Sequence, residues 1–242
     1  MDLDRFYWDN LKDFLNYINP ECRDWARNYL GTEVTKKRYI NILREIEQVP
    51  YSMICDVGAF PFYLDYLISK IYKDIKIDCF DINIDRINKD VFTRTENLNT
   101  YNHNIEVDGQ IPGDRKYDII LFLEVFEHLR FDPINLFESL KRLMNGNSRI
   151  FIQIPNLYYW KSLLRFIGGR GILDYYTEYK KLTLYGHMGH VRLPSKYEMV
   201  SFIENVGMEI AQIVNNAGKR TRKNATYLFG ESHLLYIAQL KQ

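Results

Sequence analysis

The sequence has few cysteines, no surplus of charge of one sign and no long apolar run, and each absence excludes a class of protein. Its three cysteines, Cys22, Cys55 and Cys79, form no Cys-x-x-Cys pair, which argues against a disulfide framework or a cysteine-built zinc site. The net charge of +1 provides no general attraction to nucleic acid. No apolar run reaches the ~18 residues of a membrane span, and the acidic N-terminus lacks the apolar core of a signal peptide. We therefore expect a cytoplasmic protein without a nucleic-acid partner.

The first fifth of the chain is typical of helices, and it contains no strand signal. Apolar residues recur at helical spacing from Trp8 to Ile18, before Pro20, and again from Tyr39 to Ile46, before Pro50. We interpret residues 1–50 as an N-terminal helical arm. The total of 242 residues suffices for this arm and one further domain.

Residues 51–242 alternate between apolar strand patterns and amphipathic helix patterns. Short apolar runs that end at Gly, Asp or Pro predict strands over 52–57, 75–80, 117–123, 149–154, 208–214 and 233–238. Helical spacing predicts helices over 133–144 and 194–206, and a further apolar stretch covers 63–71. This alternation favours right-handed crossovers, and therefore a doubly wound α/β fold with a mainly parallel sheet.

Residues 157–192 interrupt the alternation with an insert that is rich in aromatic residues and glycine. An aromatic segment above a sheet edge often closes over a substrate. The alternative is a loop that packs on the core. We predict a lid-like insert, and we assign Tyr158 and Tyr159 to acceptor binding.

Two residues at the ends of the first two strands indicate a nucleotide-like ligand. Gly58 directly follows a buried strand, which lets the backbone pass close to a ligand at the start of the next helix. Asp81 ends the following strand, where a carboxylate can accept both hydroxyls of a ribose. Taken alone, this pair could also be a plain turn and a solvated strand end.

The later motifs strengthen this interpretation. The string Glu124-Val-Phe-Glu127-His128-Leu129 follows an aromatic-Asp strand, and a later strand ends in Pro155-Asn156. Together with Asp56-Val-Gly-Ala, these motifs resemble the class I S-adenosylmethionine-dependent methyltransferases, in a branch that acts on small molecules and sugars. The resemblance covers residues ~52–214. It implies a Rossmann-like sheet with an antiparallel last strand, and S-adenosylmethionine as cofactor.

The resemblance also implies a set of cofactor contacts. These are Asp56 and Gly58 at the methionine end, Phe60 in the pocket wall, Asp81 and Ile82 at the ribose, Asp108 and Gly109 at the adenine, and Glu124 at the end of the fourth strand. The cofactor loop departs from the family pattern, because Phe60 and Phe62 replace its second and third glycines.

Histidines are the candidate bases. A hydroxyl must lose its proton during methyl transfer, and a neutral imidazole is suited to removing it. His190 ranks first and His128 second, while His187 and Arg192 border the acceptor pocket by resemblance. The His187/His190 pair could also hold a metal with a carboxylate, but its glycine-rich setting disfavours this. We therefore expect no metal.

The favoured hypothesis is an O-methyltransferase that acts on a carbohydrate hydroxyl. The family branch and the abundance of Asn, Ile and Lys suggest bacterial surface-polysaccharide or natural-product biosynthesis. We expect the acceptor to be a nucleotide-linked sugar of surface-polysaccharide biosynthesis. One alternative is a small-molecule N- or C-methyltransferase, because an amine acceptor would not need the histidines. Another is an interaction module with a degenerate cofactor pocket, suggested by Phe60 and Phe62. The sequence is also compatible with a homo-oligomer.

Overall fold

An eight-stranded sheet forms the centre of the computed structural model, which describes residues 1–88, 97–185, 189–221 and 231–241. Its strands are β1 (Met53–Val57), β2 (Lys76–Asp81), β3 (Leu98–Asn102), β4 (Tyr117–Leu123), β5 (Met144–Pro155), β6 (Met208–Asn215), β7 (Arg220–Thr221) and β8 (His233–Leu240). The strand order is β3-β2-β1-β4-β5-β8-β6-β7.

The pairing of the strands confirms the predicted fold class. Strands β1 to β5 pair in parallel, and β8 runs antiparallel between β5 and β6. The short β7 adds an antiparallel edge to β6. From β1 the chain builds outward to β2 and β3, and then crosses to β4 on the other side. In open α/β sheets, ligands bind at this switch point, outside the carboxyl ends of the strands.

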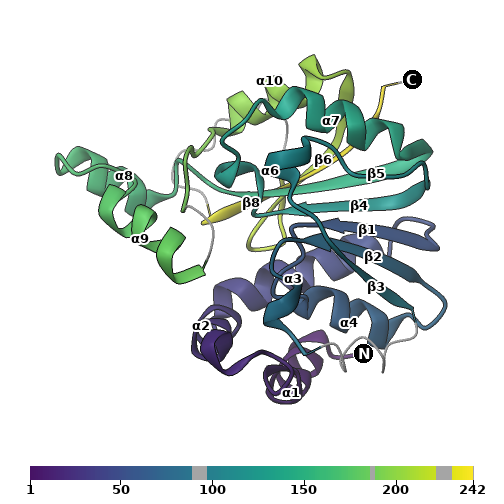
Figure 1. The fold of residues 1–242 in the computed structure, drawn as a ribbon. Helices are drawn as coiled ribbons and strands as arrows, with labels where there is room; N and C mark the ends of the chain where they lie inside the picture. Colours follow the sequence, from purple (N-terminus) through teal and green to yellow (C-terminus); the bar gives the residue numbers. More distant parts are fainter. Residues whose placement is uncertain (89–96, 186–188, 222–230, 242) are drawn as a thin grey trace.

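Helices cover both faces of the sheet (Figure 1). One face carries α1 (Leu3–Leu15), α2 (Pro20–Leu30), α3 (Glu33–Ile46) and α4 (Tyr63–Ile71), and the other carries α7 (Pro133–Arg142) and α10 (Lys196–Asn205). Short turns of helix lie at η1 (Ile84–Arg86), α6 (Ile105–Asp108) and η2 (Phe126–His128). Two hydrophobic cores form, one on each face of the sheet.

The N-terminal arm contains three helices, where the sequence pattern suggested two segments. Pro20 begins α2 rather than only ending the segment before it, because a proline at the first helical position loses no hydrogen bond. Thr32 caps α3 by accepting from the backbone N–H of Thr35 at 3.1 Å. Phe14 and Ile42 are fully buried in the same core as α4 and the sheet, so the arm is packed as part of the molecule.

The insert projects away from the body of the molecule as α8 (Trp160–Ile167) and α9 (Tyr175–Tyr185) (Figure 1). No residue of α8 is buried, and Ile167 and Tyr175 are each 77% exposed. Among the described residues, no helix is both long and apolar enough to cross a membrane.

Candidate active site

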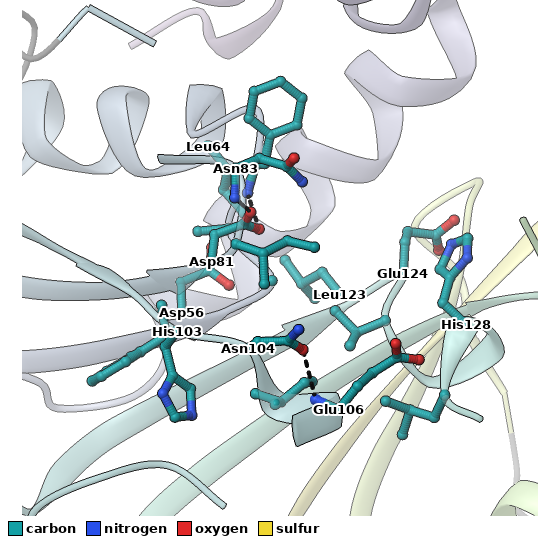
Figure 2. A pocket seen from close by; sticks show the side chains of 18 of the residues that line it. Asp56, Leu64, Asp81, Asn83, His103, Asn104, Glu106, Leu123, Glu124 and His128 are labelled. Atoms are coloured by element: carbon teal, nitrogen blue, oxygen red, sulfur yellow. Dashed lines mark hydrogen bonds between the residues drawn. The ribbon is translucent and has the colours of Figure 1, made fainter. Parts of the chain in front are cut away.

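A cavity of about 420 Å³ lies at the carboxyl ends of β1, β2 and β4. Asp56 and Asp81 lie on one side of it, and Glu124 and His128 lie at the opposite end, with Leu123 between them (Figure 2). The arm also contributes to the wall through Trp25, Tyr29, Arg38 and Tyr39. The cavity is therefore enclosed partly by the sheet edge and partly by helices that precede it in sequence.

Gly58 forms the turn between β1 and the loop before α4. Its φ of +77° favours glycine, and a Cβ there would lie 2.4 Å from Val125 Cγ2. The backbone N–H of Gly58 donates to the Phe80 carbonyl at 2.8 Å, which ties the loop to β2. Because Gly58 has no side chain, the loop after β1 can pack directly against Val125 in the segment after β4.

The two phenylalanines of the loop have separate structural roles. Phe60 lines the cavity, and its ring stacks on Trp25 with 5.3 Å between centroids. Phe62 is buried and adopts a left-handed conformation, with φ of +65°. A non-glycine residue in that region is disfavoured by roughly 1–2 kcal/mol, which the burial of the Phe62 ring offsets. Both replacements are thus accommodated without filling the cavity.

Asp81 is fixed by backbone donors at the end of β2. Its carboxylate accepts from the N–H of Phe60 at 3.0 Å and from the N–H of Asn83 at 2.6 Å (Figure 2). A carboxylate offers about four lone-pair sites, so these two bonds leave acceptor capacity for a hydroxyl pair in the cavity. The side chain is oriented before any ligand binds.

Asp56 and Asp65 form a buried pair of carboxyl groups below the cofactor loop. Burial, together with the charge of Asp65, raises the pKa of Asp56 well above its usual range. Burial raises the pKa of Asp65 to about 6, although hydrogen bonds from Asp56 and Cys79 oppose this shift. Their shared burial thus disfavours two ionised carboxylates at this point.

Glu124 is the charged residue at the end of β4. It has a left-handed φ of +57°, and its carboxylate lies 3.4 Å from Arg38 Nη2 and 3.3 Å from His233 Nε2. Burial alone would raise its pKa, but the charges of Arg38 and His233 outweigh burial and lower the pKa to about 2. Glu124 therefore stays ionised.

Arg38 connects the arm to this end of the cavity. The guanidinium is only 3% exposed, and its Nε donates to Gln153 Oε1 on β5 at 2.8 Å. It also lies over the Tyr29 ring, 5.8 Å from the centroid. One buried cation thus joins helices α2 and α3 to strands β4 and β5.

Glu127, His128 and His190 form a compact cluster beside Glu124. The Glu127 side chain is fully buried, and the His128 and His190 rings lie 4.9 Å apart. His190 Nε2 lies 3.9 Å from Glu127 Oε1. Burial, and then the charge of Glu124, raises the pKa of Glu127 well above its usual range. Burial, and then the charge of Lys181, lowers the pKa of His190, which keeps its imidazole neutral.

The segment that carries His190 is held from two sides. Its backbone N–H donates to Glu178 Oε2 on α9 at 2.7 Å, and Lys181 pairs with the same oxygen at 2.7 Å. On the other side, the N–H of Val191 donates to the carbonyl of Glu127 at 2.8 Å. The insert therefore reaches the cavity through its second helix and the residues that follow it.

The structure places most of the expected site residues around one cavity. Those that line it are Asp56, Gly58, Phe60, Asp81, Ile82, Glu124, His128 and His190. Those that do not line it are Asp108, Gly109, Tyr158, Tyr159 and Arg192. His187 lies outside the described residues.

Local contacts explain why some expected residues lie away from the cavity. Asp108 ends α6 and pairs with His103 Nδ1 at 3.3 Å, so the cavity wall at the expected adenine end is made by His103, Asn104 and Glu106 (Figure 2). Arg192 is exposed and pairs with Glu198 at 2.7 Å.

Several residues of the wall, and one partner of Glu124, were missed by the sequence analysis. Tyr29 and Arg38 belong to helices that precede the first strand, and Lys181 belongs to the insert. His233 begins β8, and the antiparallel direction of that strand brings its first residue to the carboxyl edge of the parallel strands.

The residues around the cavity fit S-adenosylmethionine. Gly58 lets the backbone approach a ligand, the fixed carboxylate of Asp81 suits a ribose, and ionised Glu124 lines the cavity with a charge that suits a cationic sulfonium. The fold and the site define the class of this protein, which is a methyltransferase that uses S-adenosylmethionine. The model of the methyltransferase domain family matches residues 55–213, and the chain belongs to this family.

Solved structures share this fold at low sequence identity. A protein from Thermotoga maritima, described as a possible histamine N-methyltransferase, is similar with a TM-score of 0.58 at 13% identity, over 90% of this chain and 95% of its own. A methyltransferase from Aquifex aeolicus gives 0.53 at 16% identity, over 87% and 100%. The DhpI–SAH complex gives 0.60 at 10% identity, over 95% and 96%. No curated protein matches the sequence.

Proposed function

We propose that this methyltransferase is a cytoplasmic O-methyltransferase, and that its acceptor is a hydroxyl of a nucleotide-linked sugar used in surface-polysaccharide biosynthesis. The observation that carries the proposal is the cluster of Glu127, His128 and His190 beside Glu124. A group that removes a proton is needed there for a hydroxyl, which is a poor nucleophile while it is protonated.

The residues have distinct roles in this reaction. S-adenosylmethionine supplies an electrophilic methyl carbon on its sulfonium. His190, whose imidazole is kept neutral, removes the hydroxyl proton, and His128 is the second candidate for this step. The acceptor oxygen forms its bond to the methyl carbon as the carbon–sulfur bond breaks. The imidazolium then releases its proton to solvent.

The polarity of the cavity end supports a hydroxylated acceptor. Arg38, Glu124, Lys181 and the two histidines line it, so a sugar would find both donors and acceptors for its hydroxyl groups. Lys181 adds a cation that suits a phosphate of the nucleotide. An apolar acceptor would place no polar group against these side chains, which disfavours its binding.

The test is methyl transfer from labelled S-adenosylmethionine to a panel of nucleotide-sugars, followed by mass spectrometry. We expect a mass increase of one methyl group in at least one sugar. Replacing the true base, as in His190→Gln or His128→Gln, should lower turnover by ~10²–10⁴-fold and leave cofactor affinity nearly unchanged. Near-full turnover in both variants, or transfer only to amines, would contradict the proposal.

An N-methyltransferase is the second candidate, and one observation favours it. The similar protein from Thermotoga maritima is described as a possible histamine N-methyltransferase. An amine panel in the same assay separates the candidates, because an amine acceptor would leave the histidines dispensable. C-methylation would appear as a product that is stable to ether cleavage.

A further inference from the structure

We propose that Glu127, His128 and His190 bind one divalent transition-metal cation at the acceptor end of the cavity. The three residues each offer one ligand atom, and these atoms lie within 4.8 Å of one another. Bonds of ~2.0–2.2 Å to a metal place neighbouring ligand atoms about 3–4 Å apart. A small rotation of the side chains would therefore bring all three onto one cation.

The strongest support is the state of Glu127. Its side chain is fully buried, and neither carboxylate oxygen has a hydrogen-bond partner. The nearest imidazole nitrogen, His190 Nε2, is 3.9 Å away, which is beyond hydrogen-bond distance. A buried carboxyl group without a partner is unfavourable. A cation between Glu127 and the two imidazoles would supply that partner.

The backbone keeps the three ligands together. Glu127 and His128 lie in η2, directly after β4, and the carbonyl of Glu127 accepts from the N–H of Val191 at 2.8 Å. The N–H of His190 is held by Glu178 at 2.7 Å. The spacing of the cluster is thus set by hydrogen bonds that do not use the ligand atoms themselves. Such support around a ligand set is a usual property of metal sites.

The ligand types select the class of cation. One carboxylate oxygen and two imidazole nitrogens suit Mn²⁺, Fe²⁺, Co²⁺ or Zn²⁺, whereas Ca²⁺ and Mg²⁺ prefer oxygen ligands alone. His128 and His190 line the cavity, while Glu127 lies behind them. Three protein ligands on one side leave the coordination positions that face the cavity available to an acceptor oxygen.

The role of the cation rests on the proposed function, although its binding does not. A hydroxyl that coordinates the cation loses its proton to solvent water at a lower pH than a free hydroxyl. Its oxygen then forms the bond to the methyl carbon as the carbon–sulfur bond breaks. With the cation bound, His128 and His190 serve as its ligands, and they do not remove the hydroxyl proton themselves as they would without it.

The test measures binding without any acceptor. The full chain is dialysed against a chelator, and Mn²⁺ is added while its free signal is followed by electron paramagnetic resonance. We expect saturable binding of one Mn²⁺ per chain. Glu127→Gln, which keeps the volume of the side chain, and His190→Gln should each weaken binding at least ~10-fold. His103→Gln is the matched control, because it removes an imidazole from the other end of the cavity and should leave the affinity unchanged.

A second measurement covers the case in which a variant does not fold. Mn²⁺ or Zn²⁺ should raise the melting temperature of the unaltered chelator-treated chain, since a ligand that binds only the folded state stabilises it. Absence of both saturable binding and a melting shift would overturn the proposal, as would unchanged affinity in folded Glu127→Gln. Full methyl transfer by chelator-treated protein would overturn the role of the cation while the proposed function stands. Cation binding without transfer to any sugar would contradict only the proposed function.

Discussion

At the scale of single residues, two glutamates three positions apart show how strongly the surroundings control ionisation. The pKa of Glu124 is lowered to about 2 because Arg38 and His233 lie against it. The pKa of Glu127 is raised because burial and the charge of Glu124 both disfavour its ionised form. The string Glu-Val-Phe-Glu therefore supplies one permanent anion and one carboxyl group that needs a partner.

Asp81→Ala should weaken the binding of S-adenosylmethionine by ~1–3 kcal/mol, measured by calorimetry. The substitution removes the acceptor for buried ribose hydroxyls and also frees the N–H of Phe60. Asp85→Ala is the control, because Asp85 is an exposed residue of η1 and does not line the cavity. Equal affinity of the two variants for S-adenosylmethionine would show that Asp81 does not contact the cofactor.

The change in unfolding free energy caused by Asp65→Asn should be more favourable at pH 8 than at pH 4. The folded-state pKa of Asp65 is raised to about 6 from the ordinary 3.8, so the folded state retains a proton that the unfolded chain releases. This contribution to stability is fully present below pH 3.8 and is lost as the pH rises through 6. The Asp65→Asn variant has no carboxyl group at this position, so it does not lose this stability as the pH rises.

Urea unfolding at several pH values measures the effect of Asp65→Asn. The control is Asp74→Asn, an exposed residue after α4, which makes the same change in composition without burial. If the difference in unfolding free energy between Asp65→Asn and the unaltered chain were the same at pH 4 and pH 8, Asp65 would not have a raised pKa.

At the scale of elements, the arm and the insert contribute to the site in different ways. The arm is packed against α4, and its Arg38 and Trp25 form part of the cavity wall. The insert is exposed along α8 and touches the site through Glu178 and Lys181 of α9. The expected acceptor contacts of Tyr158 and Tyr159 therefore require movement of the insert.

Arg38→Met should destabilise the protein by about 3 kcal/mol in urea unfolding, because it leaves Glu124 buried with one cation fewer. Adding Glu124→Gln should restore part of that loss, since the remaining charge is then removed. Arg44→Met, at an exposed position of the same helix, is the control. If the double variant were no more stable than Arg38→Met, the pair would not be coupled.

Backbone amides of α8 and α9 should exchange with deuterium faster than those of α7 in the free protein. No residue of α8 is buried, nor is any of residues 175–181 of α9, and low burial goes with local opening. Adding S-adenosylhomocysteine together with an acceptor should slow exchange in the insert if it closes as a lid. Slow exchange that no ligand changes would instead indicate fixed packing on the core.

At the scale of the whole molecule, the arm is part of the fold. A chain that starts at residue 51 would lose the side chains of Phe14 and Ile42 from the core and Arg38 from the cavity. We expect this chain to lack cooperative thermal unfolding. Trp25→Ala, which removes only the ring stacked on Phe60, should fold and bind the cofactor more weakly in calorimetry. Normal turnover without the arm would contradict its role in the site.

The features that the sequence predicted are those that depend on residues close together in the chain. Six strands follow from apolar runs, whereas the polar β3 and the two-residue β7 give no such signal. Gly58 and Asp81 follow from their positions at the ends of apolar runs. Arg38 and His233 were not predicted, because each meets Glu124 only through tertiary packing between segments far apart in the chain. The cavity wall at the expected adenine end also differs from the prediction, because the turn of α6 places Asn104 in the wall and Asp108 outside it.

The position of β8 determines the order in which the molecule can be completed during translation. β6 is synthesised before β8, yet it joins the sheet only through β8, which also pairs with β5. A nascent chain that ends before residue 233 therefore has two unfinished halves, one ending at β5 and one made of β6 and α10. It also lacks His233, whose Nε2 lies 3.3 Å from the Glu124 carboxylate. The last hydrogen bonds of the sheet and the contact of His233 with Glu124 are thus completed in the same step, so a ribosome that stalls before β8 leaves a chain with an unfinished sheet.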